Sequence, residues 1–298
     1  MNLFPIQYEE IVQQALREDL GRAGDLTSSL TVPEEATCQA QIVARQAGCV
    51  AGMAVAARVF SALDPDLKVE RHRQDGSQVE AGTPLLTISG SARSILAGER
   101  TALNFLGRMS GISQATAQGV ALLTGKARLV ATRKTTPGLR MLEKWAVVCG
   151  GGESHRFGLD DGILIKDNHV ALAGGVVEAL RRVQQGAPHL IKIELEVDTL
   201  TQLEQILAVV QEHSLRLDAV LLDNFSPAQL RQAVALVQGR WVLEASGGLK
   251  LSDLAEVSQT GVDLISLGSL THSVTNFDVA LDVVESHVQS RNRPLTAR

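Results

Sequence analysis

The stretch VVCGGGESHRFGLDDGILIKDNHV, residues 147–170, combines three consecutive glycines, a His-Arg pair and a short apolar run that ends abruptly in polar residues. The apolar run covers residues 163–165, and Lys166, Asp167, Asn168 and His169 follow it directly. In a barrel of parallel strands, catalytic side chains lie at the carboxyl ends of the strands. The stretch therefore predicts a buried strand that carries site residues at its end.

The same pattern recurs along the chain from about residue 127. Apolar runs of strand length occur in ARLVATRK, GILIKDN, LIKIELEV, DAVLLDN, RWVLEAS and DLISLGS, and amphipathic segments of helical length separate most of them. This alternation predicts parallel strands joined by helical crossovers. No Gly-x-Gly-x-x-Gly follows the first run, which favours a barrel over an open dinucleotide-binding sheet. The pattern leaves the number of strands and the closure of the barrel open.

The first 110 residues or so have a different pattern of apolar residues and glycines. We expect a helix over residues 5–19, short strands within residues 38–52 and 67–90, and a helix over residues 94–123 that Gly107 and Gly111 weaken locally. The glycine-punctuated strands resemble the half-barrel hairpins of lipoyl and biotinyl domains, but they lack a carrier lysine at a hairpin tip. We interpret this region as a small sheet that serves as a cap or as a dimer surface.

Composition excludes several classes of function. The chain has 298 residues, 45% of them hydrophobic and 20% charged, as is typical of soluble globular proteins. A net charge of −5 without a basic block, and only 3% aromatic residues, argue against nucleic-acid and anionic-membrane partners. We expect no signal peptide and no membrane helix, since no apolar run approaches about 18 residues. The three cysteines show no metal-type spacing and predict reduced thiols in the cytoplasm.

Polar residues at the strand ends define the candidate site. A single one would fit a solvated strand end or an internal ion pair, but their presence after all six predicted strands favours an active site. In KIELEV, a period of two places Lys192, Glu194 and Glu196 on one face, which we expect to line the barrel mouth. The strand ends carry Arg133, Lys134, Lys166, Asp167, Asn168, Glu194, Glu196, Asp223, Asn224, Glu244, Ser246, Ser266 and Gly268.

The cations and the small-residue turns indicate the kind of ligand. Arginine forks suit carboxylates and phosphates. The turn at Ser246, Gly247 and Gly248 precedes a helical segment, so its backbone N–H groups suit a phosphate at a helix start, and a second small-residue turn follows the last strand. Together they predict a small polyanion with one phosphate and further negative groups. The candidate cations are Arg100, Arg133, Lys134, His155, Arg156 and Lys166.

These motifs resemble those of a known family. ATRKTTPGLRMLEKWAV, GGGESHRFGLDDGILIKDNHV, ELEVDT, LLDN, EASGG and GSLTHS, in this order, together with DLTS and ERTALNFLGRMSGI, closely resemble quinolinate phosphoribosyltransferases, also called carboxylating nicotinate-nucleotide pyrophosphorylases. The resemblance covers nearly the whole chain. It implies an α/β fold in which an N-terminal α/β sandwich, residues 1–112, precedes an incomplete parallel α/β barrel with the active site, residues 113–274. We expect a C-terminal helix, residues 275–298, to pack back on the first domain.

The resemblance also implies an activity in NAD biosynthesis and a role for each site residue. The family transfers the phosphoribosyl group of phosphoribosyl pyrophosphate to quinolinate and releases pyrophosphate and CO2, with Mg²⁺ as cofactor, in homodimers or multiples of dimers. Lys134, Glu196 and Asp223 are implied as catalytic residues, with Mg²⁺ held mainly by the pyrophosphate near the two carboxylates. The implied quinolinate ligands are Arg133, His155, Arg156, Lys166 and Arg100 of the second subunit; those for phosphoribosyl pyrophosphate are Lys134, Lys166, Glu196, Asp223, Ser246, Gly247, Gly248, Ser266 and Gly268.

Two other functions fit parts of the sequence. A lysine at a barrel strand end, Lys166 or Lys134, is the iminium-forming group that a Schiff-base aldolase requires. The lipoyl-like hairpins suggest a metabolite-binding or carrier module without catalytic activity, although the missing carrier lysine and the charged barrel mouth argue against it.

Overall fold

The computed structural model describes residues 2–288, which fall into two compact units. The first unit contains the chain up to Gln114, the segment Met141–Cys149 and the chain from Thr275 onward; the second contains Ala115–Arg140 and Gly150–Val274. The segment Met141–Cys149 differs from the expected division, which assigned it to the barrel. It belongs to the first unit because Glu143 accepts hydrogen bonds from Arg108, and Trp145 donates one to Asp75.

The first unit is built on a four-stranded sheet in the order β13-β1-β5-β3. Its strands are β1 (Thr37–Ala44), β3 (Lys68–Arg71), β5 (Pro84–Ser91) and β13 (Val279–His287), and neighbouring strands are antiparallel. A separate two-stranded ribbon pairs β2 (Gly48–Cys49) with β4 (Gln78–Val79). The helices are η1 (Pro5–Gln7), α1 (Glu9–Leu20), α2 (Leu26–Thr31), α3 (Met53–Leu63), α4 (Ala92–Leu122) and α5 (Arg140–Cys149).

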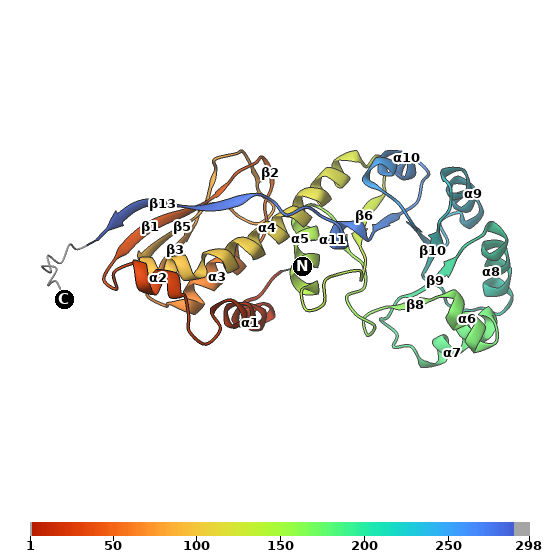
Figure 1. The fold of residues 1–298 in the computed structure, drawn as a ribbon. Helices are drawn as coiled ribbons and strands as arrows, with labels where there is room; N and C mark the ends of the chain where they lie inside the picture. The colour runs from red at the N-terminus through yellow and green to blue at the C-terminus, as the bar shows by residue number, and fades with distance from the viewer. Residues whose placement is uncertain (1, 289–298) are drawn as a thin grey trace, which may run out of the picture. The chain divides into compact units, whose positions relative to one another are not determined.

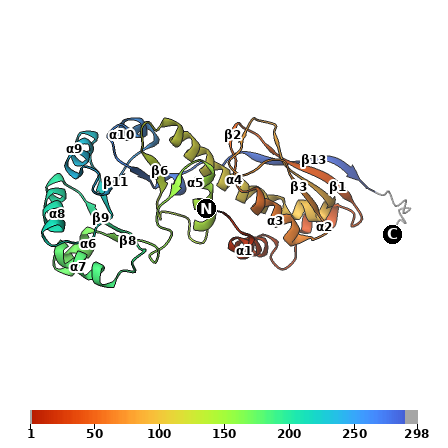
Figure 2. The same ribbon diagram turned by 180° about the vertical axis from the view of Figure 1, so that it is seen from behind.

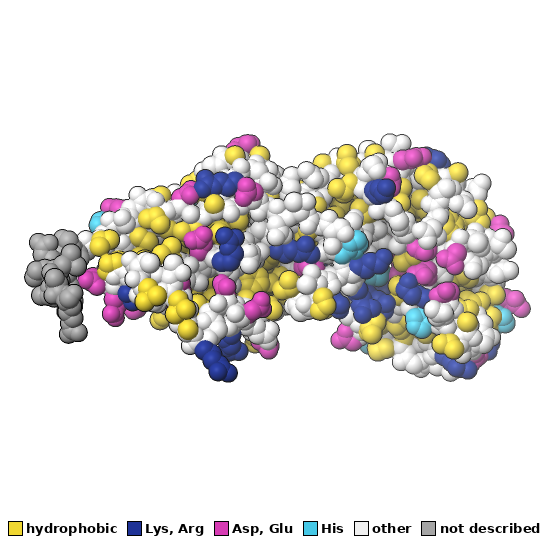
Figure 3. Space-filling model, in the orientation of Figure 1, with side chains coloured by type: hydrophobic (Ala, Val, Ile, Leu, Met, Phe, Trp, Pro, Cys, Tyr) yellow, Lys and Arg dark blue, Asp and Glu magenta, His cyan; other side chains and the backbone are white. Residues whose placement is uncertain are grey.

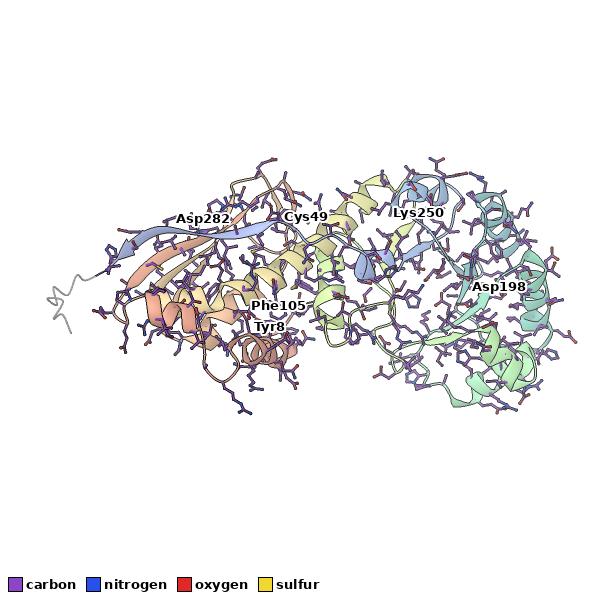
Figure 4. The ribbon with its side chains drawn as sticks, in the orientation of Figure 1. Tyr8, Cys49, Phe105, Asp198, Lys250 and Asp282 are labelled. Atoms are coloured by element: carbon purple, nitrogen blue, oxygen red, sulfur yellow. The ribbon has the colours of Figure 1, made fainter. Side chains whose placement is uncertain are left out.

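The expected C-terminal helix is wrong over residues 279–287, which form strand β13 along β1 (Figure 1). Three valines in this segment favour strand over helix, and β1 would otherwise present a row of unpaired backbone groups. Arg45 fixes the pairing further through an ion pair at 2.5 Å with Asp282, which lies on β13 (Figure 4). Residues 289–298 lie outside the described part of the chain.

Helix α4 runs without interruption through the two glycines that were expected to weaken it. A Cβ atom on Gly111 would lie 2.3 Å from the carbonyl oxygen of Thr275, and one on Gly107 would lie 3.1 Å from that of Phe277. Phe277 also donates its N–H to the Gly107 carbonyl at 2.9 Å. The glycines therefore admit the chain that leads into β13, and this close approach explains why the helix contains residues of low helical propensity.

The second unit is a parallel sheet of seven strands in the order β7-β6-β12-β11-β10-β9-β8. Six of these strands are the predicted ones: β6 (Arg128–Ala131), β8 (Ile163–Ile165), β9 (Ile193–Val197), β10 (Ala219–Asp223), β11 (Val242–Ser246) and β12 (Leu264–Leu267). The seventh, β7 (Glu153–Ser154), pairs with β6 and was not predicted. Among the described residues β7 and β8 are the two edges of the sheet, so the barrel is incomplete, as expected.

Helices cover the outer face of this sheet (Figures 1 and 2). They are α6 (Asp167–Ala173), α7 (Val176–Gly186), α8 (Leu200–Glu212), α9 (Pro227–Val237), η2 (Leu251–Asp253), α10 (Leu254–Ser258) and α11 (Ser269–His272). Helices α8 and α9 begin at capping boxes, in which Thr199 and Ser226 accept hydrogen bonds from the backbone N–H groups of Gln202 and Gln229. None of the helices within residues 2–288 has the length and apolar character needed to span a bilayer.

Candidate active site

The interior of the barrel unit contains a cavity of about 320 Å³ at the end where the strands begin. The first residue of most strands lines it, and so do Glu194 and Glu244. Because every second residue of a strand faces the same side, the residues two or four positions further along also point into the interior. By this alternation Glu196, Asp223, Ser246 and Ser266 face the interior nearer the carboxyl ends of the strands.

His155 lies directly after β7, and its backbone N–H donates to the Ala131 carbonyl of β6 at 3.2 Å. Its Nε2 lies 2.9 Å from an oxygen of Glu194 and 3.2 Å from one of Glu244. Burial alone would lower the pKa of His155, but its interactions with Glu194 and next with Glu244 outweigh burial and raise the pKa to about 10. At neutral pH the side chain is therefore an imidazolium cation.

Two arginines meet beside this imidazolium. Arg156 donates from Nη1 to the Gly162 carbonyl at 2.9 Å and lines the same cavity as His155. Burial, and next the neighbouring charge of Arg133, lower the pKa of Arg156. Nε of Arg133 is buried, and no hydrogen-bond acceptor lies near it within the described residues. Two guanidinium groups close enough to repel each other, with a buried donor still unused, form a site prepared for an anion.

Lys166 and Glu196 form an ion pair between the ends of β8 and β9. The backbone N–H of Lys166 also donates to Nδ1 of His169 at 2.9 Å, where α6 begins. The side chain of Lys166 keeps 45% of its surface exposed, whereas that of Glu196 keeps 14%. The ammonium group is thus held at the strand end by a carboxylate and remains accessible to a ligand.

Lys134 follows β6 and passes over the turn after β12. Its backbone carbonyl accepts a hydrogen bond from Thr271 at 2.7 Å. A Cβ atom on Gly268 would lie 2.9 Å from Cδ of Lys134 and 3.1 Å from Nε2 of His272. Gly268 therefore allows a lysine and a histidine to approach the same turn, which makes this turn a second candidate position for an anion.

The ends of β10 and β11 form a third part of the site. Asn224 lies in the left-handed region at φ 57° and donates from its side chain to Asp223 at 2.7 Å. Gly247 has φ 93°, and a Cβ atom there would lie 2.6 Å from the backbone nitrogen of Asn224. Gly248 also has a positive φ, at 61°. Only a glycine fits position 247, and the turn presents backbone N–H groups without side chains between them and a ligand.

The expectation that this turn opens directly into a helix is wrong. Lys250 (Figure 4) and the short 3-10 segment η2 separate it from α10, which has five residues. The N–H groups available to a phosphate are therefore those of the turn itself. Ser266 lies on β12 and faces the interior of the barrel. Its buried hydroxyl has no hydrogen-bond partner among residues 2–288.

The predicted residues of the barrel thus belong to one sheet: His155 and Arg156 line the cavity where the strands begin, and most of the others lie nearer the carboxyl ends of the strands. Figure 3 shows Lys, Arg and His side chains gathered with acidic ones on one face of this unit. Arg100 lies in the first unit, exposed on α4, and within the described residues it has no ion-pair partner.

Sequence reasoning assigned no role to three residues of the site. Glu194 and Glu244 were taken only as strand ends, and Glu194 was expected at the mouth, whereas both are buried in the interior with 7% and 1% exposure. His272 was overlooked, although the motif GSLTHS that contains it was noted. A buried glutamate on a strand predicted to face the interior would have been a usable signal, since carboxylates are rarely buried without a partner.

Comparison with known proteins agrees with the resemblance in the sequence. Family models for the N-terminal and C-terminal domains of quinolinate phosphoribosyl transferase match residues 25–110 and 112–282. A probable nicotinate-nucleotide pyrophosphorylase [carboxylating] from Bacillus subtilis (strain 168) is 41% identical over 283 residues, which are 95% of both chains. A mitochondrial quinolinate phosphoribosyltransferase [decarboxylating] from Nicotiana glauca is 40% identical over 92% of this chain and 82% of its own.

Solved structures give the same result for the fold. NadC from Streptococcus pyogenes is 36% identical and superposes with a TM-score of 0.88 over 95% of this chain and 98% of its own. The nicotinate-nucleotide pyrophosphorylase from Francisella tularensis, 34% identical, has the same TM-score and coverage. These matches confirm the predicted fold class and decide against the aldolase and carrier alternatives. The chain belongs to the quinolinate phosphoribosyltransferase family of carboxylating nicotinate-nucleotide pyrophosphorylases.

Proposed function

We propose that the barrel interior is the site where this chain carries out the activity of its family, the decarboxylating transfer of a phosphoribosyl group to quinolinate in NAD biosynthesis. The observation that carries the assignment of the site is the buried Nε of Arg133, which lacks an acceptor in the described chain and lies beside Arg156. A dicarboxylate supplies the missing acceptors and relieves the repulsion between the two guanidinium groups.

Quinolinate binds through its two carboxylates to Arg133, His155, Arg156 and Lys166. The imidazolium of His155 and the accessible ammonium of Lys166 supply two further positive charges at the carboxyl ends of β7 and β8. The 5-phosphate of phosphoribosyl pyrophosphate binds at the glycine turn, at Ser246, Gly247 and Gly248, with Ser266 and Gly268 at the neighbouring strand end. Support comes from the open backbone of this turn and from the unused hydroxyl of Ser266.

The chemistry needs no general base, since the ring nitrogen of quinolinate already carries a lone pair. The C1–O bond to pyrophosphate breaks as the N–C1 bond forms, and positive charge develops on the ribose. Glu196 and Asp223, which face the interior, stabilise that charge, and Lys134 stabilises the departing pyrophosphate. The positive charge on the alkylated ring nitrogen then stabilises the electron pair that stays on C2 when the C2–carboxylate bond breaks. CO2 leaves, and a proton takes its place on C2.

Glu196 and Asp223 would hold a Mg²⁺ ion bound together with phosphoribosyl pyrophosphate, and the ion would supply positive charge against the leaving group. The carboxylate oxygens of Glu196 and Asp223 are the hard donors that suit Mg²⁺ near the pyrophosphate. We place the enzyme in the cytoplasm, a location supported by the free state of Cys38, Cys49 and Cys149.

We also propose a homodimer in which Arg100 of each subunit completes the quinolinate site of the other. The exposure of Arg100, and the lack of an ion-pair partner for it among residues 2–288, support this assignment. A two-fold interface delivers the same residue in both directions, so both sites would be completed equally.

The assignment of the quinolinate site is tested by binding measurements on two arginine variants of the same strand region. Arg133→Leu should weaken quinolinate binding by roughly 10–100-fold, because it removes one or two charge-assisted hydrogen bonds. Arg128→Leu is the matched control: Arg128 begins β6 and pairs with Glu153 instead. Equal affinities in Arg133→Leu and the control would contradict the assignment.

A further inference from the structure

His155 is held by two carboxylates that the proposed chemistry does not use. Glu194 approaches Nε2 from β9 at 2.9 Å, and Glu244 approaches the same nitrogen from β11 at 3.2 Å. The side chains of the two glutamates are 9% and 2% exposed. One nitrogen carries one proton, so only one of the two can accept the hydrogen bond.

The geometry distinguishes the two glutamates. Glu194 is the aligned acceptor, whereas Oε2 of Glu244 lacks a hydrogen-bond partner in the described chain despite its distance from the imidazole. Glu194 therefore fixes the direction of the ring, and Glu244 acts on it through charge.

The other charged groups around this cavity are engaged elsewhere. Arg128 pairs with Glu153, and Lys192 pairs with Asp218 at the start of β10. Asp161 accepts hydrogen bonds from the backbone N–H groups of Phe157 and Gly158, and Arg156 donates to the Gly162 carbonyl. Glu194 and Glu244 are thus the anions that contact the imidazole from the strands packed against it.

We propose that Glu194 and Glu244 are positioning residues that keep His155 a cation of fixed orientation, so that quinolinate always meets a positive charge there. A neutral imidazole would lose the attraction for a carboxylate, and an imidazole paired with solvent alone would titrate near neutral pH. The two buried carboxylates move that titration out of the physiological range. In this design the enzyme's affinity for its dicarboxylate does not change with pH around neutrality.

The first test is a direct titration of His155 by NMR on protein with ¹³C- and ¹⁵N-labelled histidine, its signal identified by loss in His155→Gln. In the wild type the imidazole should stay protonated up to about pH 9, whereas in Glu244→Gln the midpoint should fall by about one pH unit or more. Glu194→Gln should also lower the titration midpoint of His155, and this variant replaces Glu244→Gln in the test if Glu244→Gln does not fold. Glu153→Gln, an exposed glutamate two residues from His155, is the control and should leave the midpoint unchanged.

The second test links this titration to substrate binding, and this half of the inference rests on the proposed function. In Glu244→Gln, kcat/KM for quinolinate should decline with rising pH at the midpoint found by NMR and recover at about pH 6. KM for phosphoribosyl pyrophosphate should stay within about twofold of the wild-type value, because the substitution does not change the groups that bind that substrate. Glutamates with a purely structural role would lower activity equally at every pH.

The outcomes separate the inference from the proposed function. An imidazole that still titrates at the wild-type midpoint in both glutamate variants overturns the inference and leaves the proposed function intact. A shifted titration without a matching decline in kcat/KM for quinolinate also overturns it, because His155 then does not serve this substrate. The three ligand atoms lie within 4.8 Å of one another, so a bound divalent metal is the remaining alternative. Stoichiometric zinc in the purified protein would overturn the imidazolium assignment.

Discussion

Replacing quinolinate by nicotinate removes one carboxylate while keeping the ring nitrogen that attacks the ribose. The structure indicates that this loss is costly, because Nε of Arg133 is buried without an acceptor in the described chain and Arg156 is repelled by its neighbour. A carboxylate can accept two charge-assisted hydrogen bonds, each contributing about 1.5–3 kcal/mol. The lost interaction is then about 3–6 kcal/mol, which corresponds to roughly 10²–10⁴-fold in kcat/KM.

The assay compares kcat/KM for the two acids at saturating phosphoribosyl pyrophosphate, with pyrophosphate release as the common readout. Both acids yield the same nucleotide, so a difference reflects recognition of the second carboxylate. Arg133→Leu should lower the ratio of kcat/KM for quinolinate to kcat/KM for nicotinate. The variant binds quinolinate more weakly, and with nicotinate bound it no longer leaves the cation at position 133 unpaired. Specificity constants within about tenfold of each other in the wild type would refute the reasoning.

Three further experiments test other parts of the site. Lys134→Ala should lower kcat by roughly 10²–10³-fold with little effect on quinolinate affinity, as expected of a charge that acts in the transition state; a weakened affinity alone would contradict its role. Gly247→Ala should abolish binding of phosphoribosyl pyrophosphate, because its Cβ would lie 2.6 Å from the backbone nitrogen of Asn224. Gly248→Ala, whose Cβ finds no atom closer than 3.8 Å, should cost only about 1–2 kcal/mol, and equal behaviour of the two variants would refute the steric argument. Arg100→Ala and Lys134→Ala, each inactive alone, should regain activity when their subunits are mixed, and heterodimers without activity would refute a shared site.

Much of the barrel could be predicted because its strands are apolar runs between amphipathic helices. Strand β7 was not predicted because it has only two residues, and both are exposed. It forms by pairing with the free edge of β6. This is a tertiary interaction, so the local sequence pattern contains no signal for it. Strand β13 escaped for a similar reason: residues 279–287 become a strand through pairing with β1, which lies more than 230 residues earlier in the chain.

The sequence predicted the residue types of the candidate site better than the position of each side chain along the barrel axis. Residues at strand ends identified Arg133, Lys166, Glu196 and Asp223 directly. Period-two alternation also gave the correct face for Glu194, but it could not give its height along the barrel. The relative shift of neighbouring strands sets that height: Glu194 pairs laterally with Ala219, the first residue of β10, and so lies in the interior below the mouth.

Catalysis by this chain consists of joining quinolinate to a phosphoribosyl group with loss of CO2. The most direct test is a mass balance on the purified protein with quinolinate, phosphoribosyl pyrophosphate and Mg²⁺, in which CO2, pyrophosphate and nicotinate mononucleotide are measured together. Equal amounts of the three products should form, and only when both substrates are present. Pyrophosphate release without CO2, or release that does not depend on quinolinate, would contradict it.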